Sequence, residues 1–404
     1  MGSLARKRRE GPVWGDIDMN TLVKTVCLWV VCMVSLAAPR GVSQGASAKG
    51  SIPEDVPVRS IFYNYSYPGI DWQALHDPKN NAVLRACVGG AASSDLAALK
   101  ISDLDERLTR LEKGKLIQRS GSDYSLRFPV VAGEAHTRLQ ASIRVAAAQM
   151  VPAVREMVKE IKAHLQGHEE MLYHFVWSAM MDSDIAWKLL EVQLQRNLEK
   201  DAIDLATCWW LYPEHPFSVG TNGYAGSNGL LIITWRRSTP APDEVRQSLD
   251  ASEGSFLAAS ARREPIPTDK ITDQLRSFGF VDAANRSTLF LLDPSSPLVP
   301  VLAQCSSRFV RLVATHLDVK DVAQSLGVAP EQALVIAYHE LCYEILGRLS
   351  AAGDLPIPQV SKEHPPGTRS LVSFLPITSP AQQDQLNEMF NKIVQKAMTE
   401  ERGR

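Results

Sequence analysis

Cys208 and His215 are the residues of this chain whose types best match nucleophilic catalysis. A nearby imidazole lowers the pKa of a thiol, and the resulting thiolate is the attacking group of cysteine hydrolases. The two residues are seven positions apart in the chain, with Pro213 between them, so the sequence permits a contact without requiring one. Trp209 and Trp210 follow the thiol directly, a pattern typical of a buried cysteine. We keep the pair as the candidate catalytic residues and predict a non-catalytic protein.

His164 and His168 have the spacing of two metal ligands on one helical face. The residues between them are Leu-Gln-Gly, without the catalytic glutamate of zinc peptidases, and Gly167 weakens a helix at this point. The segment 339–344 (His-Glu-Leu-Cys-Tyr-Glu) looks like part of a zinc-binding helix, but its second histidine is missing. The sequence therefore predicts no metal and no other cofactor.

Glycines recur at every third residue from Gly220 to Gly229, as they do in some phosphate-binding loops. Those loops lead into a helix N-terminus, where free N–H groups face the anion. Here the glycines lead into the apolar run 230–235, which is typical of a strand. We interpret them as turns in a hairpin or small sheet.

The N-terminus has the features of an export signal. A basic cluster at 6–9 precedes an apolar run at 25–38, too short to span a bilayer and suited to a signal-peptide core. Residues 46–48 (Ala-Ser-Ala) resemble a cleavage site. We predict a signal peptide or signal anchor over 1–48 and an extracytoplasmic location, periplasmic or secreted, for the rest. Membrane contact is then expected only through an uncleaved segment; a buried N-terminal helix of a cytoplasmic protein is the alternative.

Residues 80–130 carry the clearest local pattern, which predicts three helices followed by a β-hairpin. The expected elements are helices at 81–87, from Ser93, and after an N-cap at Ser102, then strands at 115–119 and 124–128. This order resembles the winged-helix module of MarR and ArsR-like regulators. The residues that carry the resemblance are the segment 95–99, the leucines 104, 108 and 111, and the glycines 114 and 121. In such modules the third helix presents its N-terminal side chains to DNA bases.

The charges of this segment disfavour DNA as its partner. Its third helix begins with Asp103, Asp105 and Glu106, which repel phosphates, and residues 91–130 hold seven Lys or Arg against six Asp or Glu. The basic residues that could contact phosphates, and that we take as the candidate binding residues, are Arg107, Arg110, Lys113, Lys115 and Arg119. We predict a winged helix that binds an unidentified protein, with nucleic acid as the disfavoured alternative.

The remaining chain is predicted to be mainly helical, which makes the fold class α+β. An extended arm is expected at 49–79, a helical region with a small hairpin at 131–240, and a second α+β unit with a C-terminal helix at 241–404. The long helical pattern at 132–166 is expected to break at Pro152. A second helix-turn-helix-like segment at 321–328 precedes an apolar helix at 333–338, which we expect to be buried.

Composition excludes several classes of protein. Hydrophobic residues make up 45% and charged residues 22%, which excludes a disordered or coiled-coil chain, and the net charge of −2 excludes a globally basic nucleic-acid binder. The four cysteines beyond the signal segment are compatible with two disulfides or with ordinary buried thiols. We predict an exported cell-envelope protein with a binding or scaffolding role, and its sequence is compatible with a homodimer. A DNA-binding regulator, tethered to a membrane or not, and an envelope hydrolase are the alternatives.

Overall fold

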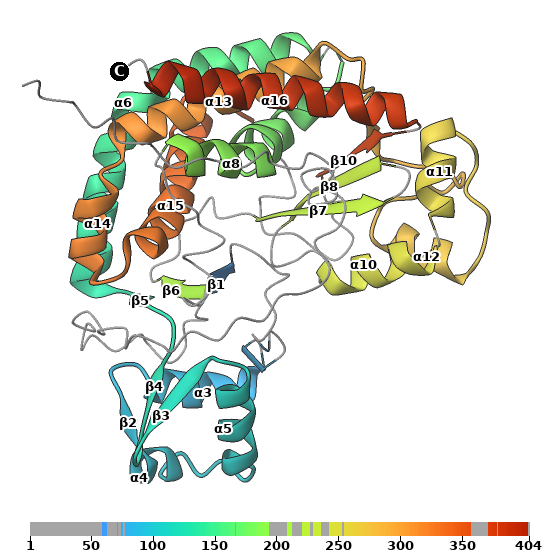
Figure 1. The fold of residues 1–404 in the computed structure, drawn as a ribbon. Coiled ribbons are helices and arrows are strands. Elements are labelled where there is room, and N and C mark those ends of the chain that lie inside the picture. The colour runs from blue at the N-terminus through green and yellow to red at the C-terminus, as the bar shows by residue number, and fades with distance from the viewer. Residues whose placement is uncertain are drawn as a thin grey trace, which may run out of the picture. The chain divides into compact units, whose positions relative to one another are not determined.

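The computed structural model describes residues 59–62, 71, 74–75, 77–165, 167–193, 208–211, 220–226, 229–235, 242–252, 254–356, 371–377 and 379–402. Within these residues the chain is a predominantly helical α+β protein whose strands gather in small sheets (Figure 1). The predicted fold class is confirmed at this level. The predicted signal segment lies outside the described residues.

A small N-terminal unit, residues 74–132, packs helices on a three-stranded sheet. Its elements are α3 (Pro78–Ala86), β2 (Ala91–Ala92), α4 (Ser93–Ala97), α5 (Leu104–Lys113), β3 (Ile117–Ser120) and β4 (Asp123–Leu126). Strand β4 lies between β2 and β3, and both pairings are antiparallel. Leu84, Leu96 and Leu111 are fully buried in a hydrophobic core that belongs to this unit.

Local signals explain where these helices begin. Helix α3 starts after Asp77, whose carboxylate accepts the N–H of Lys79 at 2.9 Å, and Pro78 occupies its first turn. The predicted N-cap at Ser102 is wrong, because α5 begins one residue later, with Asp103 at the N-cap position. The carboxylate of Asp103 bonds to the side chain of Arg107 instead of capping the helix. A charged partner one turn away thus competes successfully with the backbone N–H groups.

A second short sheet connects this unit to distant parts of the chain. Strand β5 (Val130–Val131) runs parallel to β6 (Cys208–Leu211), and β6 pairs in antiparallel fashion with β1 (Arg59–Phe62). Segments some 150 residues apart therefore meet in one sheet, which local sequence patterns could not indicate.

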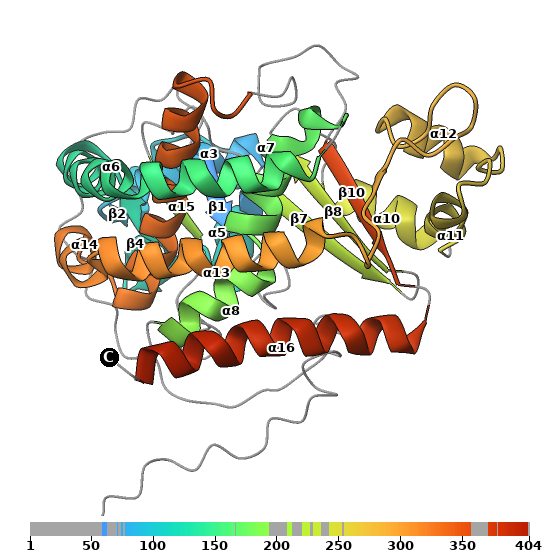
Figure 2. The same ribbon diagram turned by 90° about the horizontal axis from the view of Figure 1, so that it is seen from above.

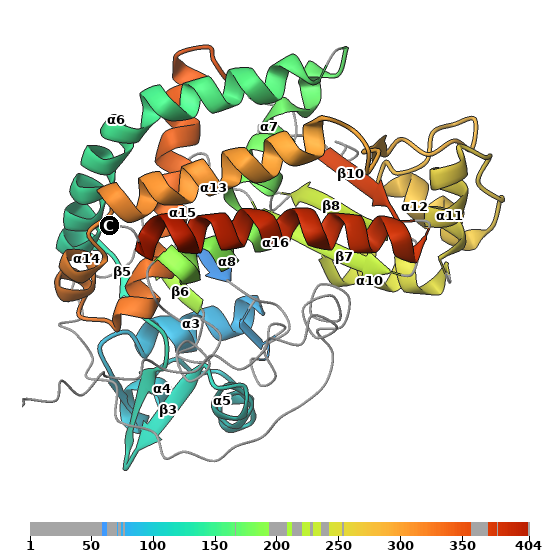
Figure 3. The same ribbon diagram turned by 45° about the horizontal axis from the view of Figure 1, so that its top comes forward.

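Helix α15 (Pro330–Ala351) lies in the main hydrophobic core, and most of its residues are buried. The helices and the π-helix that contribute to this core with it are α6 (Gly133–Ala163), α7 (Leu172–His174), η2 (Phe175–Met181), α8 (Asp184–Gln193), α13 (Leu298–His316), α14 (Val319–Leu326) and α16 (Pro380–Arg402). The burial of α15 confirms the prediction for 333–338. The predicted break at Pro152 is wrong, because α6 continues through this exposed residue and curves, as Figure 3 shows.

A four-stranded sheet lies between the main core and a second group of helices (Figure 2). The strands, in spatial order, are β7 (Gly220–Gly226), β8 (Gly229–Trp235), β10 (Leu371–Pro376) and β9 (Phe290–Leu291). The second group of helices is α10 (Pro242–Ala251), α11 (Ser255–Arg262) and α12 (Lys270–Ser277). Residues alternate between the two sides, since Leu231 and Ile233 pack against this group and Leu230 packs against the main core.

The β7–β8 hairpin confirms the predicted hairpin at 220–235, with Gly226 paired to Gly229. The glycines at 220, 223 and 226 lie within strand β7, so their interpretation as turns is wrong. Strand β10 pairs with β8 in antiparallel fashion. The predicted regions 131–240 and 241–404 therefore contribute strands to the same sheet.

Candidate functional site

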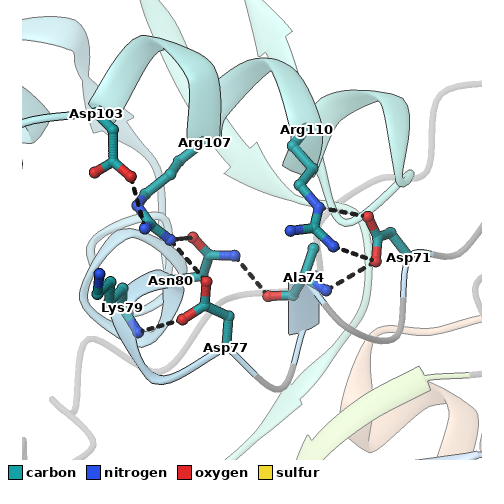
Figure 4. Close-up of polar contacts among 8 residues, drawn as sticks. All are labelled: Asp71, Ala74, Asp77, Lys79, Asn80, Asp103, Arg107 and Arg110. Atoms are coloured by element: carbon teal, nitrogen blue, oxygen red, sulfur yellow. Dashed lines mark hydrogen bonds and ion pairs between the residues drawn. The ribbon is translucent and has the colours of Figure 1, made fainter.

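Arg107 lies at the centre of a polar cluster that joins α5 to the start of α3 (Figure 4). Its guanidinium donates to Asp77 at 2.9 Å and to the carboxamide of Asn80 at 2.8 Å. It also donates to Asp103 at 2.7 Å. Only 11% of this side chain is exposed. Arg107, the first of the residues predicted to contact phosphates, therefore connects α5 to the start of α3.

Arg110 forms a two-pronged ion pair with Asp71, at 2.6 Å from Nε and 3.1 Å from the second nitrogen. Asp71 in turn accepts the N–H of Ala74 at 2.8 Å, and its own N–H donates to the carbonyl of Gly114 at 3.4 Å. A Cβ at Gly114 would lie 2.8 Å from the Cβ of Asp71. Glycine at this position allows the segment around Asp71 to approach the end of α5 closely.

The ion pairs fix the charges of this cluster. The Arg107 guanidinium lowers the pKa of the Asp77 carboxyl and that of Asp103. The pKa of Arg107 is raised in return, first by Asp103 and then by Asp77, and Asp71 raises that of Arg110. Two of the basic residues that we took as phosphate contacts are therefore neutralised by carboxylates within reach of α5.

The solvent-facing side of α5 is acidic. We call it the α5 face, and it consists of the exposed residues Asp105, Glu106, Thr109, Glu112 and Lys113. Arg110 is exposed beside them but is paired with Asp71. Three carboxylates face one ammonium group, so the face is net negative. An open depression of about 760 Å³ lies beside it, lined partly by Asp71, Arg110 and Gly114. A surface of this kind suits a polar or basic protein surface better than a nucleic-acid backbone.

The other two predicted binding residues lie away from this cluster. Lys115 follows α5 with a left-handed backbone (φ 56°) and is exposed. Arg119 lies on β3, with its guanidinium 5.6 Å from the centre of the Tyr124 ring. Exposed cations therefore lie at the C-terminal end of α5 and on the hairpin: Lys113, Lys115 and Arg119. The acidic residues of α5 begin at its N-terminal end.

The two candidate metal ligands do not share a helical face. Helix α6 ends at Ala163, His164 lies past its end, and Gly167 takes a left-handed conformation (φ 76°). His168 follows this turn and makes an edge contact with the ring of Phe290. The predicted shared face is wrong because α6 ends at Ala163, before either histidine, and the left-handed Gly167 follows in the turn between them. No group of His, Cys, Asp or Glu among the described residues could hold a metal ion.

The candidate catalytic pair falls partly outside the described residues. Cys208 begins strand β6, with Phe62 opposite it on β1, and His215 lies outside the described residues. Three other cysteines are free and buried: Cys87, Cys305 and Cys342. For these three, the alternative of ordinary buried thiols is the one that holds.

The residues that looked like part of a zinc helix pack inside the main core. On α15, Nδ1 of His339 donates to the carbonyl of Val335 at 2.8 Å, and burial lowers the pKa of this histidine to about 4. Glu340 accepts a hydrogen bond from the side-chain amide of Gln140 on α6 at 2.7 Å. Both side chains therefore connect neighbouring helical turns or helices within the core.

A buried chain of hydrogen bonds surrounds His174, which no motif in the sequence indicated. Its Nδ1 lies 2.7 Å from the hydroxyl of Thr234 on β8, and its Nε2 lies 2.8 Å from that of Ser373 on β10. The Thr234 hydroxyl lies 2.5 Å from that of Ser178, which accepts from Thr221 at 3.0 Å. The available signal was a hydroxyl residue inside each of two otherwise apolar strands, at positions 234 and 373.

Among the described helices, none is both long and apolar enough to span a bilayer. No protein-family model, curated protein or solved structure matches this chain.

Proposed function

We propose that residues 74–132 are a winged-helix-like module that binds a protein partner through the α5 face, and that this binding is the function of the module. The order of its elements supports the assignment: one helix, a short strand, two helices and a hairpin. The sheet order β2-β4-β3, with the hairpin strand β4 in the middle, supports it too. Fold alone does not choose the partner, so the choice depends on the surface chemistry of α5.

The proposal depends on one observation: both arginines of α5 form ion pairs with carboxylates of this same chain. A helix that reads DNA needs free cations along its exposed side, because phosphate contacts supply most of the binding energy. Here Arg107 and Arg110 bond to carboxylates, while Asp105 and Glu106 occupy the first exposed turn. These acidic residues would repel a duplex and would attract a basic segment of a protein.

The DNA alternative is tested by fluorescence anisotropy with a mixed-sequence duplex at 50 and 200 mM salt. We expect no salt-sensitive binding by the wild-type protein. The double variant Asp105→Lys/Glu106→Lys changes two exposed side chains by four charge units and is expected to gain such binding, which shows that the assay can detect it. Tight wild-type binding that weakens by a factor of about 10³ or more between the two salt concentrations would overturn the proposal.

Partner binding is tested by placing a photoreactive amino acid at Thr109, in the middle of the α5 face. The same reagent at Arg262, exposed on α11, is the matched control. We expect a discrete crosslinked protein from Thr109 in cells that make this protein, and its loss in the Asp105→Lys/Glu106→Lys background. Identical products from both positions would contradict a specific site on α5.

We also propose that the protein acts outside the cytoplasm, as part of the cell envelope or as a secreted protein. The basic cluster at 6–9 and the apolar run at 25–38 support this location. Fractionation with N-terminal sequencing tests it, and a mature start near Lys49 in an extracytoplasmic fraction is the expected result. An intact N-terminus in the cytoplasm would refute it.

A further inference from the structure

The contact between the four-stranded sheet and the main core is unusually polar at its centre. On this side of the sheet, Leu230, Leu371 and Leu375 pack against the core as expected for a buried face. Between them lie hydroxyl side chains that bond to the imidazole of His174. We name as the polar joint the residues His174, Ser178, Thr221, Thr234 and Ser373.

The polar joint connects five elements through one uncharged ring. His174 ends α7, Ser178 belongs to η2, and the hydroxyls of Thr221, Thr234 and Ser373 come from β7, β8 and β10. A neutral imidazole donates through one ring nitrogen and accepts through the other, and hydroxyl groups can take either role. Each hydrogen bond of the polar joint can therefore form while the imidazole of His174 is neutral.

Among the described residues around His174, none carries a charge that would stabilise an imidazolium. The groups that face the ring are the hydroxyls of Thr234 and Ser373, together with the ring of Phe175 at 5.2 Å between centroids. The adjacent titratable residue, Tyr173, is itself fully buried. Burial alone lowers the pKa of His174 to about 3, with no contribution from a described carboxylate or cation.

We propose that the polar joint is an acid-sensitive contact, in which protonation of His174 releases the β7-β8-β10-β9 sheet from the main core. The released imidazole regains water and its ordinary pKa near 6.5. Below that pH the released state binds a proton that the closed state excludes, so acidification favours release. This inference is independent of the α5 face and uses none of its residues.

The expected size of the effect follows from the two pKa values. Between pH 7.5 and 4.5 a free imidazole goes from mostly neutral to almost fully charged, while His174 in the closed joint stays neutral. Proton linkage then raises the equilibrium constant for opening by about 100-fold. Buried histidines that charge on acidification act as switches of this kind in other proteins.

The test is amide hydrogen exchange of the full chain at pH 7.5 and 4.5, with each rate divided by the rate of the same amide in an unstructured peptide. We expect protection in 229–235 and 371–376 to fall about 100-fold on acidification, while α15 loses less. His174→Gln retains one donor and one acceptor but cannot titrate in this range, so the pH effect should disappear. The control His339→Gln removes another buried histidine and should leave the effect on the strands intact.

Ser373→Ala covers the case in which His174→Gln does not fold. It leaves the imidazole in place and removes one hydroxyl, so we expect more opening at pH 7.5 and the same fold-change on acidification. Three results would overturn the inference: unchanged strand protection at pH 4.5, the same acid response in His174→Gln, or an equal loss of protection in α15. The last would mean that the whole protein unfolds and that the sheet is not released separately.

Discussion

Gly114→Ala tests how closely the segment around Asp71 must approach the end of α5. Gly114 has an ordinary backbone conformation (φ −74°, ψ 6°), so alanine carries no backbone penalty there. By itself the change should stabilise the protein by about 0.4–1 kcal/mol, because it reduces the freedom of the unfolded chain. The added methyl group, however, would lie 2.8 Å from the Cβ of Asp71 and 3.3 Å from its backbone nitrogen.

The steric cost should exceed the entropic gain. Neither of these atoms is the end of a flexible side chain, so relief requires moving the backbone at Asp71, and overpacking of this kind costs about 1–3 kcal/mol. We expect a net loss of about 1–2 kcal/mol in the free energy of unfolding of the N-terminal unit, measured by urea titration. The amide of Leu75, which donates to the carbonyl of Asp71, should also exchange faster.

A double-mutant cycle isolates the contact. Asp71→Gly removes the Cβ that the new methyl group would meet, so Gly114→Ala should cost at least about 1 kcal/mol less in that background. Gly121 is a control in open space, where alanine meets nothing within 4 Å and only the left-handed backbone (φ 64°) opposes it. If Gly114→Ala stabilises the protein, or costs the same with and without the Asp71 side chain, the close approach does not exist.

Three further predictions concern the cores. Leu111→Ala should destabilise the N-terminal unit by about 3 kcal/mol, because Leu111 is fully buried in its small core. Urea unfolding measures this loss, provided that the m-value is the same as in the wild type. A loss below about 1 kcal/mol would contradict the packing of Leu111. His339 should lower the stability by about 3 kcal/mol as the pH drops from 6.5 towards 4, because it is neutral when folded and charged when unfolded. The pH profile of urea midpoints should become shallower by this amount in His339→Gln, while the separate contribution of His174 remains; an unchanged slope would contradict the burial of His339. Cys305 should not react with a maleimide at pH 7.5 until urea is added. The residue is buried, and burial raises the pKa of its thiol to about 12. Rapid labelling of Cys305 in the native protein would refute this prediction.

The N-terminal unit was the most predictable part of the fold, because its elements are specified by neighbours in sequence. The leucines at 108 and 111 repeat at helical spacing and are buried as expected, and Gly114 ends the helix. The predicted cap at Ser102 is wrong because α5 begins one residue later, and the carboxylate of Asp103 at the N-cap position pairs with Arg107 one turn away. Such competition between a cap and a charged side chain depends on geometry that a linear pattern does not contain.

The candidate site was less predictable than the fold around it. The sequence identified Arg107 and Arg110 as available cations, since nothing near them in the chain indicated Asp77 and Asp71 as partners, 30 and 39 residues away. Tertiary packing brings these carboxylates to α5, where Asp77 pairs with the largely buried Arg107 and Asp71 pairs with Arg110 at the surface. The acidic character of the first turn of α5, by contrast, follows directly from Asp105 and Glu106 in the sequence.

The sequence by itself determined the helical periodicities, the hairpins and the burial of α15, since each follows from residues within a few positions of one another. Only the tertiary structure decided which charges meet and which polar groups are buried together. His174 and Ser373 are 199 residues apart and Arg110 and Asp71 are 39 apart, and no periodic pattern connects them. The physical reason is that hydrogen bonds and ion pairs act over a few ångströms in space, and packing of the hydrophobic cores sets those distances.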